Sequence, residues 1–242
     1  MAGHLSSTSS FAVRFKDGVV IAGDTLVSSG RMLKYKGVER MYEVTPHCVL
    51  AFTGDFADFQ YLRNYLERKM CEYKYETHNF EAELSAKSIY HWLTSILYFR
   101  RSRFNPVWAN LLVAGVQEKS DWLQPEEEGA VEGRKEPFLG YVTIRGSAVD
   151  HNYVATGAGQ VLLMQLLENE FKARQRQGKS EMTREEAVKL VRDCAKVMLT
   201  KDCSTNEQVD IWVVTAAGVE KEKEKRVEQD WSCADRIVNY YQ

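Results

Sequence analysis

The chain has 242 residues, and its 34 acidic and 32 basic side chains give a formal net charge of −2. Hydrophobic residues make up 44% of the sequence and aromatic residues 11%, which excludes a disordered chain and predicts a globular protein. The small net charge argues against a nucleic-acid-binding protein, which normally has a basic excess. No apolar run reaches the roughly 18 residues that a membrane-spanning helix needs. We also expect no secretory signal in the first ten residues, which lack an apolar stretch.

The cysteines indicate reduced thiols inside a cell. The sequence has five of them, an odd number, with wide spacing and no C-x-x-C motif: Cys48, Cys71, Cys194, Cys203 and Cys233. A disulfide framework or a zinc site would show paired, closely spaced cysteines. The five histidines are scattered singly, so we expect neither a metal centre nor a Cys–His pair.

The first sixty residues predict strands. Apolar residues alternate with other residues from Phe11 to Phe15, and Asp17-Gly18 is a typical hairpin turn. Residues 19–22 are all apolar, as in a strand that is covered on both faces. Further strands are expected at residues 32–35, 39–44 and 48–52.

Two helices follow, and then more strands. Apolar residues recur at helical spacing from Phe56 to Met70 and from Ile89 to Leu97, and Asn105-Pro106 ends the second helix. Strands are expected at residues 111–116, 138–144 and 151–155. Residues 118–136, which are rich in glutamate, predict a solvated surface insertion.

A second pair of helices is predicted near the C-terminal end. The first begins after Gly157-Ala158-Gly159 and has apolar residues at 161, 162, 164, 166 and 167. The second begins at a capping box, Thr183 to Glu186. A last strand at residues 209–215 precedes the charged run 220–226, which we interpret as a solvated face, and an apolar tail.

This order of elements favours one α+β domain over residues 1–226, followed by an arm at residues 227–242. Two groups of strands, each followed by two helices, predict two sheets packed face to face with a helix pair on each outer side. A Rossmann fold would alternate single strands and helices. The Gly157-Ala158-Gly159 turn also lacks the third glycine of a dinucleotide site, because Leu162 stands there.

The segment from Thr8 to Asp24 carries the most specific signal. A hydroxyl residue opens a strand, a tight turn reverses the chain, and the return strand ends in aspartate. This segment resembles the proteasome β subunits, which belong to the N-terminal-nucleophile hydrolases. Four further segments match the family in order and spacing: residues 38–40, 53–58, 155–159 and 201–205. The resemblance implies a four-layer αββα sandwich.

The resemblance also implies where a catalytic site would lie. In active members a threonine is both nucleophile and N-terminus, and its free α-amine acts as the general base. Thr8 stands at that position, and Asp24 at the aspartate that holds a lysine. Gly54 stands at the turn whose N–H stabilises an oxyanion, and Asp202 at the aspartate that orients the amine.

Three positions depart from the active pattern. Arg40 replaces the lysine, and arginine does not release a proton in proteins. Ala158 replaces one orienting serine, whereas Thr205 keeps a hydroxyl at the other. Ser7 replaces the glycine that normally precedes the nucleophile in self-cleavage. We therefore predict no catalytic residue: Thr8 is an ordinary strand residue, and Arg40 and Asp24 form a partly buried ion pair.

Three segments are similar to a non-catalytic β subunit of the eukaryotic ring: residues 54–62, 100–108 and 138–142. Residues 230–237 resemble the start of that subunit's C-terminal arm. This resemblance implies a structural subunit of the 20S core in the cytoplasm and nucleus. Its partners would be neighbouring β subunits, the α ring and, through the arm, the opposite β ring. We expect no cofactor, metal, nucleic acid or membrane.

Two alternatives remain open. The chain could be an active threonine endopeptidase with Thr8 as nucleophile, or a stand-alone hydrolase or chaperone with the same fold. The first would need a mature chain that starts at Thr8, and the second would have little use for the arm.

Overall fold

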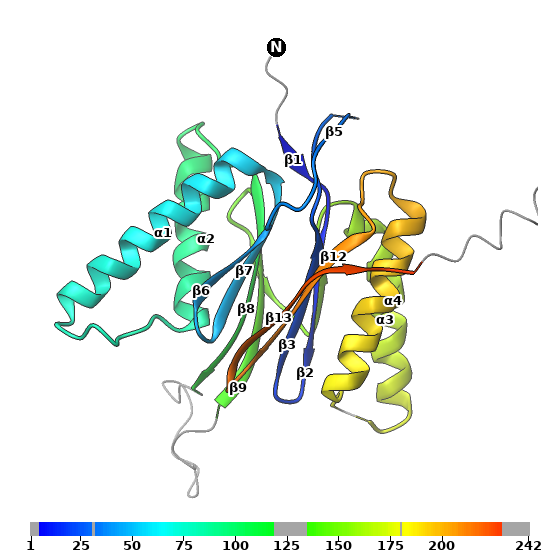
Figure 1. Cartoon of the computed structure of the whole chain (residues 1–242). Coiled ribbons are helices and arrows are strands. Elements are labelled where there is room, and N and C mark those ends of the chain that lie inside the picture. Colours follow the sequence, from blue (N-terminus) through cyan, green and yellow to red (C-terminus); the bar gives the residue numbers. More distant parts are fainter. Residues whose placement is uncertain (1–4, 31, 119–134, 180, 229–242) are drawn as a thin grey trace, which may run out of the picture.

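The computed structural model describes residues 5–30, 32–118, 135–179 and 181–228. These residues form four layers, a helix pair, two sheets face to face and a second helix pair (Figure 1). The predicted α+β sandwich is confirmed.

The first sheet has eight antiparallel strands in the order β10-β9-β8-β7-β1-β4-β5, with β6 paired to β7. Its strands are β1 (Ser6–Ser7), β4 (Val27–Ser29), β5 (Met32–Tyr35), β6 (Met41–Thr45), β7 (Cys48–Asp55), β8 (Ala109–Glu118), β9 (Lys135–Val142) and β10 (Ala148–Asp150). The sequence did not predict β1, β4 or β10. Each of these strands has only two or three residues, too few to show an alternating pattern.

The second sheet has five antiparallel strands in the order β11-β2-β3-β12-β13. They are β2 (Ser10–Phe15), β3 (Gly18–Asp24), β11 (Tyr153–Ala155), β12 (Gln208–Thr215) and β13 (Gly218–Arg226). Every residue of β3 is buried, as its continuous apolar run predicts.

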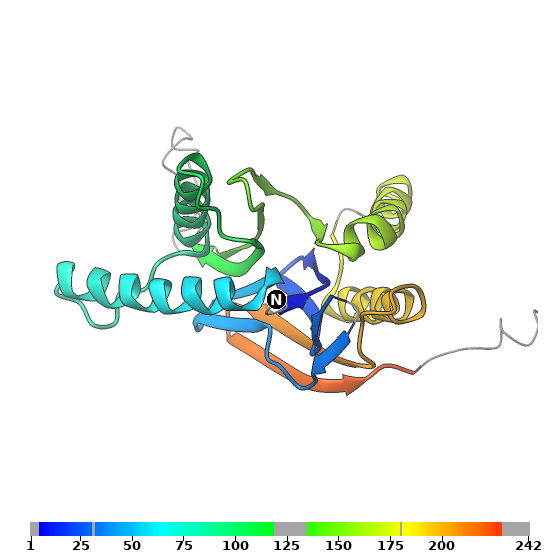
Figure 2. The same cartoon turned by 90° about the horizontal axis from the view of Figure 1, so that it is seen from above.

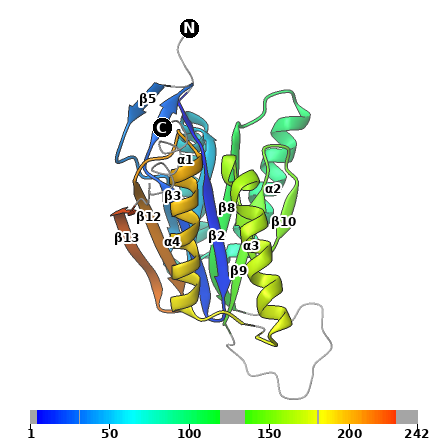
Figure 3. The same cartoon turned by 90° about the vertical axis from the view of Figure 1, so that its right-hand side faces the viewer.

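Two helices cover each outer face. The first sheet carries α1 (Phe56–Glu76) and α2 (Ala86–Ser102), and the second carries α3 (Ala158–Arg176) and α4 (Arg184–Lys201). Figure 2 shows the two pairs on opposite sides, and Figure 3 shows α3 and α4 in front of the sheets. The capping box predicted at Thr183 and Glu186 is present. None of the described helices is long and apolar enough to cross a membrane.

Three buried clusters hold the layers together. One lies under α1 and α2 and includes the stacked rings of Phe52 and Phe59, whose centroids are 3.9 Å apart. Another lies between the sheets around Ile21 and Trp212. The last lies under α3 and α4 around Leu163 and Cys194. Burial of these apolar side chains is the main force that holds the four layers together.

Two local predictions need correction. The β2–β3 turn is formed by Lys16 and Asp17, because Phe15 pairs directly with Gly18. A Cβ at Gly18 would lie 2.1 Å from the Val214 carbonyl oxygen, so glycine is required there for close strand packing. On α3 the sequence placed Val161 among the apolar contacts, yet it is 84% exposed, and Leu163 is buried instead.

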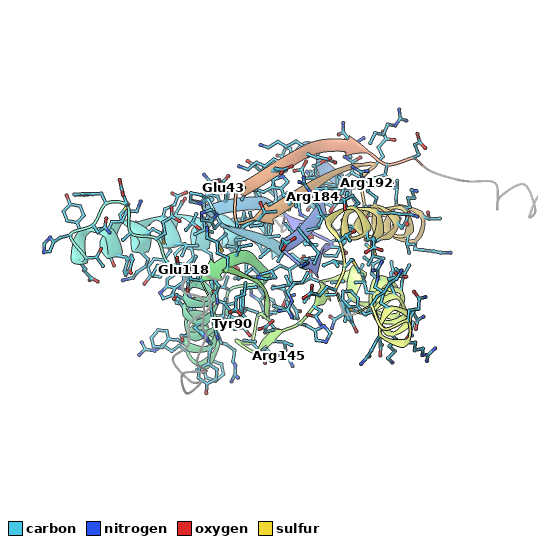
Figure 4. The ribbon with its side chains drawn as sticks, turned by 90° about the horizontal axis from the view of Figure 1, so that it is seen from below. Glu43, Tyr90, Glu118, Arg145, Arg184 and Arg192 are labelled. Carbon is cyan, nitrogen blue, oxygen red and sulfur yellow. The ribbon has the colours of Figure 1, made fainter. Side chains whose placement is uncertain are left out.

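The charged run at residues 220–226 is not a simple solvated face, because it belongs to the edge strand β13. The side chains of residues 220–223 alternate between two neighbours, as strand geometry requires. Figure 4 labels three of their partners, Glu43 on β6 and Arg184 and Arg192 on α4. Lys221 and Lys223 face the first sheet, and Glu220 and Glu222 face α4, through the ion pairs Lys221–Glu43, Lys223–Glu39, Arg184–Glu220 and Arg192–Glu222.

Two sequence predictions fall largely outside the described residues. The acidic insertion predicted at residues 118–136 is described only at its two ends, where β8 stops and β9 begins. The arm predicted at residues 227–242 is described only at Val227 and Glu228.

Candidate active site

Thr8 lies in the short connection between β1 and β2, whose positions Figure 1 shows. Its side-chain oxygen Oγ1 is buried and has no hydrogen-bond partner among the described residues. Its carbonyl oxygen lies against Gly157, where an added Cβ would be only 1.7 Å away. Gly157 also has a φ of +60°, so glycine is needed here both for space and for backbone conformation.

The residues before Thr8 form part of the first sheet. Ser6 pairs with Ser28 on one side and Asp55 on the other, and Ser7 pairs with Gly54. The Gly54 N–H donates a hydrogen bond to Ser7 Oγ at 3.2 Å. Thus β1 pairs with the last two residues of β7, beyond the part of β7 that pairs with β6. The N–H that the resemblance assigns to an oxyanion already has an acceptor.

Arg40 and Asp24 form a fully buried ion pair, with side chains only 1% and 3% exposed. This corrects the predicted partial burial. Arg40 Nη1 bonds to Asp24 Oδ1, while Nη2 donates to the Ser9 carbonyl oxygen at 2.7 Å. Nη2 also lies 3.3 Å from both the Phe52 carbonyl oxygen and Ser10 Oγ. One guanidinium therefore connects the end of β3 to the start of β2 and to β7.

Opposing effects act on the pKa of the Asp24 carboxyl. Burial raises the pKa of Asp24 above its ordinary value of 3.8, while the charge of Arg40 and the Asn206 N–H lower it. That N–H lies 3.4 Å from Asp24 Oδ2. Arginine stays protonated in proteins, so Arg40 supplies positive charge but cannot exchange a proton with Thr8 near neutral pH.

The residues that the resemblance assigns to orienting the α-amine are retained only in part. Asp202 ends α4, and its Oδ2 accepts a hydrogen bond from Thr205 Oγ1 at 3.1 Å. Asp202 is also close enough to Asp24 for its negative charge to raise the pKa of Asp24. Ala158, the first residue of α3, adds no hydroxyl. In the described part of the chain no hydrogen bond joins Asp202 or Thr205 to Thr8.

A network of hydroxyls beside Thr8 was not foreseen from the sequence. The Oγ1 atoms of Thr53 and Thr156 lie 2.6 Å apart. Thr156 Oγ1 also donates to the Ser10 carbonyl oxygen at 2.9 Å and accepts the Ser10 N–H at 3.0 Å. This network holds the two sheets together at the start of β2. Its sequence signal is weak: Ser10 begins one strand, Thr53 lies near the end of another, and Thr156 follows a third.

A small hollow adjoins the buried ion pair. The hollow beside Asp24 has a volume of about 10 Å³ and is lined by Thr205, Met198 and Phe11, among others. That is room for about one water molecule at most. Within the described ranges, no three His, Cys, Asp or Glu side chains gather to hold a metal ion.

Comparison with known proteins decides the family. A family model described as "Proteasome subunit" matches residues 5–123 and 128–214. The chain belongs to the proteasome subunit family. Its four layers are those expected of this family.

The similar proteins include several proteasome subunits named beta type-4. The Drosophila melanogaster protein is 33% identical over 239 residues, which cover 99% of this chain and 81% of that protein. The Xenopus laevis protein is 31% identical over 238 residues, 98% of this chain and 88% of its own length. The Arabidopsis thaliana protein is 31% identical over 217 residues, 89% of this chain and 78% of its own. These matches confirm the predicted similarity to a eukaryotic proteasome β subunit.

Proposed function

We propose that this chain is a non-catalytic, structural β subunit of the 20S proteasome core. In this proposal it helps assemble and bridge the two β rings, while other subunits cut the peptides. The observation that carries the proposal is the hydrogen bond from the Gly54 N–H to Ser7 Oγ. This bond occupies the oxyanion position with the chain's own residue.

Two further features support the absence of catalysis. Ser7 is paired in β1, and while the bond between Ser7 and Thr8 is intact the nitrogen of Thr8 is an amide and not an amine. An amide nitrogen is not a base near neutral pH, whereas a free α-amine has a pKa of about 8. Arg40 stands where a lysine would relay a proton, and it makes hydrogen bonds that hold it in place.

The structural role rests on the family and on the predicted arm. At the start of the arm, Val227 is buried, and its N–H donates to the Glu207 carbonyl oxygen at 2.9 Å. The proposed partners are neighbouring β subunits, the α ring and, through residues 227–242, the opposite β ring. Residence in the cytoplasm and nucleus is part of the same proposal.

The alternative is an active threonine endopeptidase with Thr8 as nucleophile. It is favoured by the retained groups Asp24, Gly54, Asp202 and Thr205. It requires cleavage between Ser7 and Thr8, with loss of β1 from the sheet.

A substitution at Thr8 within the assembled complex separates the two. Thr8→Val keeps the shape and replaces the hydroxyl with a methyl group, and that hydroxyl has no hydrogen-bond partner among the described residues. The proposal expects complexes with T8V to form normally and to keep every peptidase activity at the level of the unsubstituted complex. Loss of one activity in an intact complex would favour the alternative.

Deletion of residues 227–242 tests the bridging role. We expect half-cores that contain this truncated chain but pair several-fold less than half-cores with the full chain, as measured by native gel electrophoresis. Unchanged pairing would overturn the role proposed for the arm. If even the full chain enters no core, a stand-alone protein is favoured instead.

A further inference from the structure

The end of α2 and the loop after it expose an unusual group of side chains. They combine large apolar surfaces with positive charge, and we call them the aromatic–arginine patch: Tyr98, Phe99, Arg101, Arg103, Phe104 and Trp108. Phe104 is 98% exposed, Trp108 61%, Tyr98 55% and Phe99 50%. The C-terminal end of α2, which carries the patch, lies at the same end of the sandwich as β1 (Figure 1).

The loop itself is well ordered by hydrogen bonds, so its exposure is not that of a loose end. The Phe104 N–H donates to the Arg101 carbonyl oxygen at 3.1 Å, and Arg100 Nε donates to the Asn105 carbonyl oxygen at 3.0 Å. The Trp108 N–H donates to Asp58 Oδ2 at 2.7 Å. Phe104 adopts a φ of +57°, which is rare for a bulky residue, and this conformation directs its ring to solvent.

The arginines are held by stacking and leave their N–H groups free. The Arg103 guanidinium lies 4.3 Å from the centre of the Phe99 ring, and that of Arg101 lies 5.0 Å from the centre of the Tyr98 ring. In the described part of the chain neither arginine has an ion pair or a side-chain hydrogen bond. A stacked guanidinium keeps its planar edge available for a carboxylate, which it binds through two parallel hydrogen bonds.

The charged residues in this stretch of the chain have one sign. From residue 84 to residue 117 the sequence has no aspartate or glutamate, although the whole chain has net charge −2. The carboxylate of Asp58 on α1 contacts the patch, where it is already bonded to the Trp108 N–H. Arginine and aromatic side chains are enriched among the residues that contribute most of the binding energy at protein–protein interfaces.

We propose that the aromatic–arginine patch binds an acidic segment of a neighbouring protein that also presents an apolar side chain. The carboxylates would pair with Arg101 and Arg103, and the apolar group would pack against Phe104 and Trp108. The identity of the neighbour as a proteasome subunit rests on the proposed function, but the chemistry of the surface does not.

Photo-crosslinking tests this directly. Phe104 is replaced by p-benzoylphenylalanine, which retains an aromatic side chain, and the full chain is expressed in its own cells, irradiated, purified and mapped by mass spectrometry. We expect crosslinks to a protein segment with an excess of Asp and Glu. In an R101Q/R103Q background the yield should fall at least about fivefold, because two charge-assisted contacts are lost. It should not change in the matched control R68Q/R176Q, whose arginines are exposed elsewhere.

Each outcome decides a separate question. Crosslinks to basic or neutral segments, or no crosslink, in an intact proteasome complex would overturn the patch proposal and leave the proposed function standing. Acidic crosslinks without any proteasome complex would overturn the proposed function alone. If R101Q/R103Q lowers the melting temperature but not the crosslink yield, the arginines only stabilise the C-terminal end of α2, and the proposal is wrong.

Discussion

Ser7 lies opposite Gly54 across the β1–β7 pair, and its hydroxyl oxygen accepts the Gly54 N–H at 3.2 Å. In an active member of the family this N–H would face the oxygen of a substrate carbonyl. Here the chain supplies its own acceptor from the residue before Thr8. The same pairing places Ser7 directly before Thr8 on the edge of β7, which is the arrangement that the proposed non-catalytic function requires.

Removal of the Arg40 side chain should strongly destabilise the fold. In Arg40→Ala the buried carboxylate of Asp24 loses its partner, and loss of one member of a buried pair costs about 3–5 kcal/mol in the free energy of unfolding. Chemical denaturation measures this cost. Arg40→Lys should cost less than Arg40→Ala, because lysine keeps the positive charge. It should still destabilise the fold, because lysine cannot reach as many acceptors.

The cost of Arg40→Ala should depend on pH. Arg40 lowers the pKa of Asp24 and burial raises it, so without Arg40 the folded pKa rises further. A carboxyl with a raised folded pKa favours folding at low pH, and this stability is lost as the pH rises through that pKa. The difference between wild type and R40A should therefore be smaller at pH 4.5 than at pH 7.5. An equal or larger difference at pH 4.5 would contradict this account of the pair.

Gly157 and Gly159 provide a matched pair of substitutions. Gly157→Ala places a Cβ 1.7 Å from the Thr8 carbonyl oxygen and strains a φ of +60°, so we expect a loss of more than about 3 kcal/mol of stability. Gly159→Ala lies in α3, and its nearest neighbour would be 3.5 Å away, an ordinary contact. Thermal unfolding should therefore show a large decrease for the first variant and little or none for the second. Similar melting temperatures would mean that Thr8 does not approach Gly157 closely.

The cysteines should differ sharply in reactivity. Burial raises the pKa of the Cys48 and Cys194 thiols to about 12, so on the order of one in 10⁴ is a thiolate at pH 8. Cys71 and Cys203 are exposed. Maleimide labelling of the native protein followed by peptide mapping should modify Cys71 and Cys203 and leave Cys48 and Cys194 unmodified until the protein unfolds. Fast labelling of Cys48 would contradict the packing of the first sheet against α2.

Glu186 should contribute stability that is lost in acid. Its hydrogen bonds from Arg174 and from the Thr183 backbone lower the pKa of its carboxyl from 4.5 to about 2. A lowered folded pKa gives stability that is present above the unfolded pKa and is lost as the pH falls toward the folded one. The unfolding free energies of wild type and Glu186→Gln should therefore differ at pH 7 and converge between about pH 4.5 and pH 2. A difference that grows in acid would contradict the capping role.

Much of the fold follows from local patterns that the sequence displays directly. The apolar stripes that end at Met70, Leu97 and Met198 specify three of the helices, because buried side chains must recur at helical spacing. The pairing of Asp24 with Arg40 also follows, through the family resemblance. The alternating charges of β13 resemble a solvated segment in the sequence. In the structure they form an edge strand, and charged residues on both of its faces have ion-pair partners.

Other features of the site depend on contacts between distant segments. Ser7 and Gly54, or Thr53 and Thr156, meet only when the strands are in register. No spacing within one segment encodes those meetings. Leu163 replaces Val161 on the buried face of α3 for the same reason, because the sheet beneath decides which side of an apolar helix is covered.

The most direct measurement is the intact mass and N-terminal sequence of this chain, isolated from its native complex after treatment with a threonine-directed covalent inhibitor. The proposed function predicts a chain that begins before Thr8 and carries no adduct, because Ser7 remains paired with Gly54 and no free amine exists at Thr8. A chain that begins at Thr8 and carries the adduct would show that Arg40 can replace lysine, and it would contradict the non-catalytic role.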